Sequence, residues 1–237
     1  MDAKTAFLDE IRRAAPRMGG ARGFLLLAAL ALLATLIPGR LGGAFVDPTY
    51  QAAYTALAFL FAGSYAAQGF AGERERQFLI NWAGDPRPVV LGKALAAALW
   101  GWLCWLLIYG VSLAWMSAGA GPELPPLLTL AGAAALAAGG AWVSATAGAA
   151  IGLSVFSPVT ARQLLRLGFF FILLVLLTVP RLLPDDIQDS LRGLLRWDRA
   201  GKTMMGTGAA LGLAGMVFYR RALSLLTDLR TGLSITG

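Results

Sequence analysis

Long runs without charge restrict the fold of this chain more than any other feature. Six apolar runs occur, at residues 23–38, 50–71, 89–118, 127–156, 165–183 and 203–219. A membrane-spanning helix needs roughly 20 mostly apolar residues, so all but the short first run reach or approach that length. Backbone groups in lipid must be hydrogen-bonded within their own segment, and the alternation that marks barrel strands is missing. The sequence therefore predicts an all-α polytopic membrane protein with six transmembrane helices, in one transmembrane domain over residues 1–237.

The composition supports lipid as the solvent and excludes several kinds of site. The 237 residues are 57% hydrophobic and 14% charged, whereas soluble domains carry about 25% charge. There is no histidine, which excludes His-dependent hydrolases, haem sites with an axial His and His-based zinc sites. Cys104 is the single cysteine, so an internal disulfide is also excluded. No GxxxxGK[ST] phosphate loop is present. We predict no catalytic residue, no metal site and no cofactor in this chain, and hence no enzyme.

The basic residues predict the orientation. With the N-terminus inside, the inner segments carry 14 of the 20 Lys and Arg residues and 7 of the 13 acids, which accounts for the net charge of +7. The positive-inside rule then places both termini in the cytoplasm, and we expect a bacterial inner membrane. This topology accounts for the net positive charge, so nucleic-acid binding is not needed to explain it. Lys93, Arg162 and Arg166 stand at the inner ends of spans, where their side chains can snorkel to the surface.

Two flanking segments are amphipathic. Residues 1–20 predict an interfacial helix, rather than a cleavable signal or a solvated tail. Its apolar face would hold Phe7, Leu8, Ile11 and Ala15, and its polar face Asp9, Glu10, Arg12 and Arg13. Residues 181–202 predict short helices in the outer leaflet, with a plain surface loop as the alternative.

Small and aromatic residues pattern two of the spans. Gly140, Ser144, Gly148 and Gly152 recur every four residues, a stripe that lets another helix approach closely; a weaker pair is Gly208 and Gly212. Packing within the chain is the favoured interpretation of the stripe, and a subunit interface or a conduit is the alternative. In the third span the aromatic residues are interpreted as lipid-facing, with substrate stacking as the alternative: Trp100, Trp102, Trp105, Tyr109 and Trp115.

A charged island, GERERQFLINWAGDPRPVVLGK at residues 72–93, separates the second and third runs. Phe78, Leu79 and Trp82 form a narrow apolar stripe, preceded by four charges: Glu73, Arg74, Glu75 and Arg76. Gly84, Pro86 and Pro88 end this pattern. Residues 72–88 therefore predict an amphipathic cytoplasmic helix. Exposed aromatic residues beside mixed charge are typical of a docking surface, and a helix that contacts only lipid is the alternative.

This island resembles the cytoplasmic loop of ABC type-2 permeases, the membrane subunits of ATP-binding-cassette exporters. Their loop reads roughly E-R-E-x-G-T-L-E-x-L-L-x-x-P, followed by L-G-K. Glu73, Glu75, Leu79 and Pro86 match in register, and Leu91-Gly92-Lys93 matches the close, while Gln77-Phe78 replaces Gly-Thr and Ile80 the second Glu. The layout of interfacial helix, six spans and outer helices is similar to that family along the whole chain.

The resemblance implies a mechanism. Two identical or related permeases would pair around a substrate path, and two cytoplasmic ATPase subunits would bind ATP-Mg beneath them. The loop helix would act as a coupling helix, with Glu73, Arg74, Glu75 and Arg76 as charge partners and Phe78, Leu79, Trp82 and Pro86 completing the ATPase-docking surface. Two other hypotheses stay open: a non-transporting scaffold or immunity-type protein, and a stand-alone carrier or channel. The uncharged spans disfavour proton coupling, and no residue pattern selects a substrate.

Overall fold

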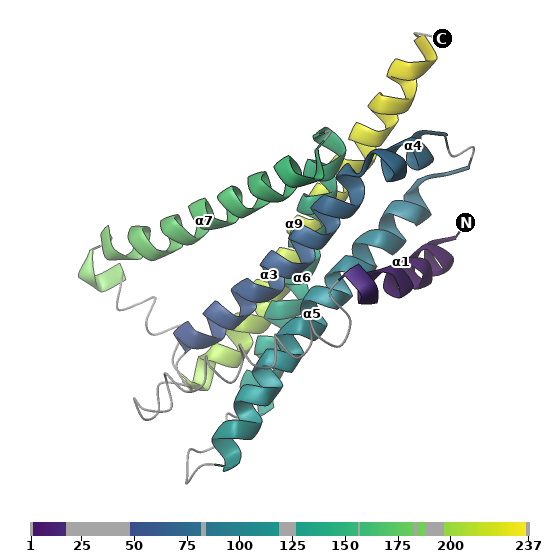
Figure 1. The fold of residues 1–237 in the computed structure, drawn as a ribbon. Coiled ribbons are helices and arrows are strands. Elements are labelled where there is room, and N and C mark those ends of the chain that lie inside the picture. The colour runs from purple at the N-terminus through teal and green to yellow at the C-terminus, as the bar shows by residue number, and fades with distance from the viewer. Residues whose placement is uncertain are drawn as a thin grey trace.

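The computed structural model describes residues 2–17, 48–81, 84–118, 127–155, 157–182, 184–187 and 197–235. These residues are almost entirely helical and contain no strand. The helices are α1 (Ala3–Arg17), α3 (Pro48–Ala71), α4 (Glu73–Asn81), α5 (Arg87–Ala118), α6 (Leu127–Ser154), α7 (Pro158–Leu182) and α9 (Trp197–Ile235). Figure 1 shows α3, α5, α6 and α9 as a bundle of long helices, with the short α4 at one end and α1 lying across α5.

Helix α6 is the centre of the bundle and contacts α3, α5, α7 and α9. Its core side is made of alanines spaced by four residues, and all are buried: Ala133, Ala137, Ala141, Ala145 and Ala149. Methyl-sized side chains let the helix axes approach closely, so van der Waals contact between backbones replaces the interlocking of large side chains.

The predicted small-residue stripe of α6 faces α3. The hydroxyl of Ser144 donates a hydrogen bond of 2.5 Å to the carbonyl of Phe59, and a Cβ added at Gly140 would meet the ring of Phe59. A Cβ at Gly148 would meet the backbone of Gly63, and one at Gly152 would lie 2.7 Å from the carbonyl oxygen of Ala67. This stripe therefore serves packing within the chain.

A second glycine contact joins α6 to α9, and the sequence predicted only Gly208 of its members. A Cβ at Gly139 would meet the carbonyl of Gly208, and one at Gly132 would meet that of Gly201. Gly215 lies against the ring of Trp142, so the α9 glycines repeat every seven residues. Gly208 of the predicted weaker pair lies in this contact, whereas a Cβ at Gly212 would meet no atom of the described residues within 4 Å.

Three of the described helical stretches are long and apolar enough to cross a membrane: Arg87–Val111, Leu127–Ser154 and Ala200–Thr231. The chain thus carries membrane-spanning candidates, and the count of six spans stays a prediction. Helices also occupy the second and fifth predicted runs, as α3 and α7. The first run, 23–38, lies outside the described residues.

Several boundaries differ from the predictions. Helix α7 begins at Pro158, so most of the segment between the fourth and fifth apolar runs is helical. The hydroxyl of Ser157 accepts a hydrogen bond from the Thr160 N–H, and proline is favoured in a first turn. Helix α9 begins at Trp197, so residues 197–202 belong to it and not to a separate outer helix. Its 39 residues give a length of about 58 Å, nearly twice the hydrocarbon thickness.

Helix α7 leans away from the bundle and contacts α3 and α6 (Figure 1). Large apolar side chains on it are exposed: Leu164, Leu167, Phe170, Phe171 and Leu174. In a membrane protein such a surface is covered by lipid or by another membrane-embedded chain.

The aromatic residues of α5 differ from their predicted lipid-facing role. Trp105 and Tyr109 are buried and stack with ring centroids 4.9 Å apart, and the indole N–H of Trp102 donates to the carbonyl of Ala134 at 3.2 Å. Because α5 packs against α3 and α6, its aromatic side faces the bundle interior. The side chain of Trp115 is outside what the structure describes.

Candidate functional site

Helix α4 is a short helix set against one end of the bundle. It is separated from α3 by Gly72 and contacts both α3 and α9. Its Leu79 side chain has no exposed surface, whereas Phe78 is 39% exposed. The apolar stripe therefore divides in two: Leu79 fastens α4 to the core, and Phe78 faces outward. Leu79 does not lie on the surface where the docking prediction placed it.

Other predicted docking residues are described less fully. Glu73, Arg74, Glu75 and Arg76 form the first turn of α4, but their side chains are outside what the structure describes. Trp82 lies outside the described residues. Pro86 is half-buried and precedes the first turn of α5, where the N–H of Val90 donates to its carbonyl at 3.0 Å.

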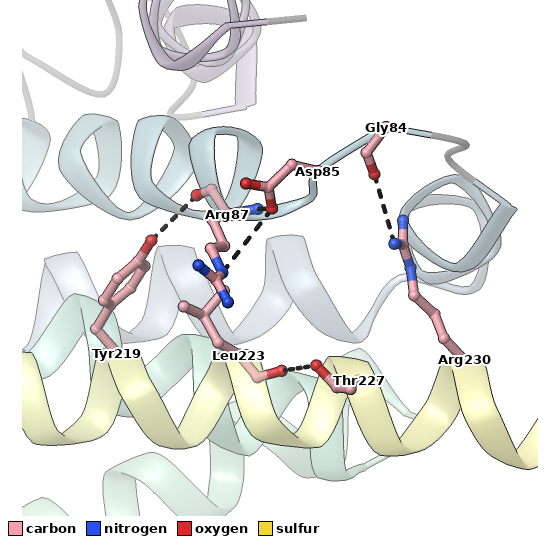
Figure 2. Close-up of polar contacts among 7 residues, drawn as sticks. All are labelled: Gly84, Asp85, Arg87, Tyr219, Leu223, Thr227 and Arg230. Carbon is pink, nitrogen blue, oxygen red and sulfur yellow. Dashed lines mark hydrogen bonds and ion pairs between the residues drawn. The ribbon is translucent and has the colours of Figure 1, made fainter.

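Arg230, near the end of α9, holds the C-terminal end of α4. Its guanidinium donates to the carbonyl of Leu79 from Nη2 at 2.8 Å and from Nε at 3.1 Å, and to the carbonyl of Gly84 at 3.5 Å. The last carbonyls of a helix have no intrahelical donor, and the negative end of the helix dipole favours a cation. One arginine therefore caps α4 at Leu79, and it also reaches Gly84 in the segment that leads to α5, a contact that Figure 2 shows.

Three turns earlier, α9 makes a second attachment to the same loop. The Tyr219 hydroxyl donates to the carbonyl of Arg87 at 3.1 Å. Asp85 accepts from the N–H of Arg87 at 3.0 Å, a capping contact for α5, and its carboxylate lies 4.0 Å from the Arg87 guanidinium. Figure 2 shows Tyr219, Leu223, Thr227 and Arg230 along the side of α9 that faces the loop.

Helix α1 crosses α5 at Gly92. A Cβ there would meet the carbonyl of Ala3 and would lie 2.8 Å from the Ala6 Cβ and 2.9 Å from the Phe7 nitrogen. Only glycine admits the α1 backbone at this distance. At the start of α1, two hydrogen bonds from Thr5 hold the pKa of the Asp2 carboxyl below its usual value; the backbone bond is 2.8 Å long.

A buried ion pair locks this crossing. Lys93 Nζ lies 3.6 Å from Glu10 Oε2, and both side chains are less than a tenth exposed. The Tyr65 hydroxyl on α3 donates to Glu10 Oε1 at 2.7 Å. Glu10 was expected on the solvent face of α1 and Lys93 was expected to snorkel; both expectations are wrong, because each charge is neutralised by the other inside the protein. The Gly92-Lys93 pair at the end of the charged island therefore forms the contact site for α1 on α5.

The start of α5 thus connects two attachments: α1 packs against α5 at Gly92, and α4 and the loop before α5 are held by the end of α9 (Figure 1). A force on α4 would pass into α3 through the chain and into α9 through Arg230. Sequence reasoning missed Arg230, Tyr219, Tyr65 and the role of Glu10. The one available signal was the helical spacing of Tyr219, Leu223 and Arg230, from the last residue of the final apolar run onward, which is weak by itself.

Comparison of this chain with family models, with curated proteins and with solved structures finds no match.

Proposed function

We propose that this protein is the permease subunit of an ATP-driven exporter, and that α4 is the helix through which a separate ATPase subunit moves it. The observation that carries the proposal is the attachment of α4. The partly exposed Phe78 stands on a helix that the buried Leu79 anchors to the core and whose C-terminal end is capped by Arg230. The resemblance of the island to the permease family supplies the class of partner.

A coupling element must transmit force, and therefore must be held at several points. Leu79 is anchored in the core, its carbonyl is bound by Arg230, and the carbonyl of Arg87 is bound by Tyr219. Eleven residues of α9 separate Tyr219 from Arg230, or about 16 Å at the helical rise. Two attachments that far apart make the loop and α9 move as one body. A switching transition of this kind needs a rigid element beside an interface with two arrangements.

The docking surface on α4 would combine Phe78 with the charged first turn. A partly exposed aromatic residue among charges is the composition of an interface core with a polar rim. The ATPase subunits would bind ATP-Mg in the cytoplasm, on the side to which the predicted topology assigns α4 and both termini. No phosphate loop in this sequence competes for that role.

A second permease copy would complete the substrate path. The exposed apolar side chains of α7, with Leu167 66% and Phe171 67% exposed, offer a surface for it. Because α7 already leans from the bundle, a partner seated there would enclose a space between the two chains.

The test is to express the protein together with a P-loop ATPase encoded by an adjacent gene and to measure whether the two co-purify. We expect Phe78→Asp to abolish ATPase binding while the protein stays membrane-inserted, because a buried carboxylate at an interface core is strongly unfavourable. Leu8→Asp on α1 is a control that introduces the same charge at another exposed apolar residue, outside α4, and should keep ATPase binding. Unchanged ATPase binding by Phe78→Asp would contradict the proposal. Substrate flux through the purified chain without nucleotide would establish a stand-alone carrier instead.

A further inference from the structure

A basic cavity lies between the loop after α4 and the end of α9. Its volume is about 870 Å³. The lining includes three arginines and one acid: Arg87, Arg220, Arg230 and Asp85. The remaining lining is mostly from α9 and includes Met216, Tyr219 and Leu223, the last two of which are drawn in Figure 2. The formal charge of the lining is +2, from three cations and one carboxylate.

Two of these cations are available to a ligand. The Arg87 side chain is 75% exposed, and its pairing with Asp85 at 4.0 Å stands at the limit of an ion pair, which at such exposure contributes little. Arg220 is exposed. Arg230 is held by the carbonyls of Leu79 and Gly84, so it adds a fixed positive charge to the wall.

The wall changes from polar to apolar along α9. Met216 and Leu223 line the cavity. The part of α9 just before Arg220 also exposes Leu213, Val217 and Phe218. Arg220 and Arg221 follow directly, at the end of the uncharged run 203–219, which lies within the candidate membrane span Ala200–Thr231. A ligand that fits both parts has an anionic head and an apolar tail, and it lies at a bilayer surface.

We propose that this cavity binds the phosphate group of an anionic phospholipid. Arg87 and Arg220 pair with the phosphate oxygens, and the acyl chains lie over the exposed apolar turn of α9. Basic pockets between membrane helices recognise anionic head groups through this chemistry. Asp85 opposes binding, because its carboxylate faces the same space. The inference requires membrane insertion and not transport, so its failure would leave the proposed function standing.

The experiment is native mass spectrometry of the full chain in a neutral detergent. Short-chain phosphatidylglycerol, phosphatidylcholine and inorganic phosphate are titrated separately. We expect phosphatidylglycerol to bind in preference to phosphatidylcholine. Each of Arg87→Gln and Arg220→Gln should raise the dissociation constant for phosphatidylglycerol about fivefold, which is the effect of one basic residue near an anionic surface. Arg166→Gln on α7 removes the same charge from an exposed site outside the cavity and should leave binding unchanged.

Asp85→Asn supplies a readout in the opposite direction. Asparagine caps helices as well as aspartate, so α5 keeps its first turn while the opposing charge is lost. We expect tighter phosphatidylglycerol binding, which a damaged fold would not produce. The proposal is overturned if Arg87→Gln and Arg220→Gln keep the wild-type preference, or if Arg166→Gln weakens binding equally. Inorganic phosphate bound as tightly as the lipid would overturn the assignment to a phospholipid.

Discussion

Arg230→Met tests the attachment of α4 most directly. Methionine keeps an apolar stem and removes every donor, so the carbonyl of Leu79 loses its bonds of 2.8 and 3.1 Å and that of Gly84 a longer one. A hydrogen bond to a charged group contributes about 1.5–3 kcal/mol. Both short bonds reach the same carbonyl oxygen at a partly buried site. We therefore expect the free energy of local opening of α4, its detachment and unfolding from the bundle, to fall by about 2 kcal/mol.

Hydrogen exchange followed by mass spectrometry measures this loss locally. When opening and closing are fast, the exchange rate of an amide follows the population of the open form. A loss of about 2 kcal/mol raises that population roughly 30-fold, so α4 amides should exchange roughly 30 times faster in Arg230→Met. The amides of α6 should not change, because they lie in the centre of the bundle and Arg230 touches none of them in the described contacts.

Arg221→Gln is the matched control. Arg221 lies on the same helix, and its described side-chain contact is with Ser224 one turn further along α9. Its loss removes one charge from α9 without freeing a carbonyl of α4. Unchanged exchange of α4 in Arg230→Met, or equal acceleration in Arg221→Gln, would refute the assignment of Arg230 as the cap of α4.

Two further predictions concern the packing that supports the site. Glu10→Ala removes the carboxylate that pairs with the buried Lys93, and it should lower the free energy of unfolding by about 3–5 kcal/mol, measured by thermal unfolding in detergent. Glu10→Leu combined with Lys93→Met should restore most of that stability. A Glu10→Ala variant as stable as the wild type would contradict the buried pair. Gly208→Ala should lower the unfolding temperature, because its Cβ would lie 2.5 Å from the Ala135 carbonyl oxygen, at a cost of about 1–3 kcal/mol. Gly212→Ala, with open space around it, should be neutral or stabilise by up to about 1 kcal/mol, and the reverse order of the two would show that the glycine contact is misassigned.

The positions of the helices could be predicted because they depend on local chemistry. Apolar runs of sufficient length select helices in lipid, and Gly84, Pro86 and Pro88 separate α4 from α5 whatever packs around them. The four-residue stripe of α6 likewise predicted close packing, since small residues every fourth position form one helix face. The identity of the helix seated on that face was not part of the pattern.

The ends of the helices were harder to predict than their existence. Pro158 and Trp197 each begin a helix earlier than the apolar run suggested. Hydropathy marks only the residues that prefer lipid, whereas a helix continues for as long as its backbone bonds and its neighbours permit. The charged end of α9 is helical and packs against α4, although its composition resembles a surface segment.

The sequence by itself determined that this is a helical, lipid-compatible chain with an amphipathic break after residue 71, because hydropathy and helix breakers act within a few residues. Only the tertiary structure decided what the polar residues do. Arg230 meets Leu79 across 151 residues of chain, and Tyr65 meets Glu10 across 55. Charges with no apolar periodicity look like solvent-facing residues in a sequence. Their burial and pairing follow from how distant helices dock, and that docking depends on the fit of whole helix faces, which no local window of sequence contains.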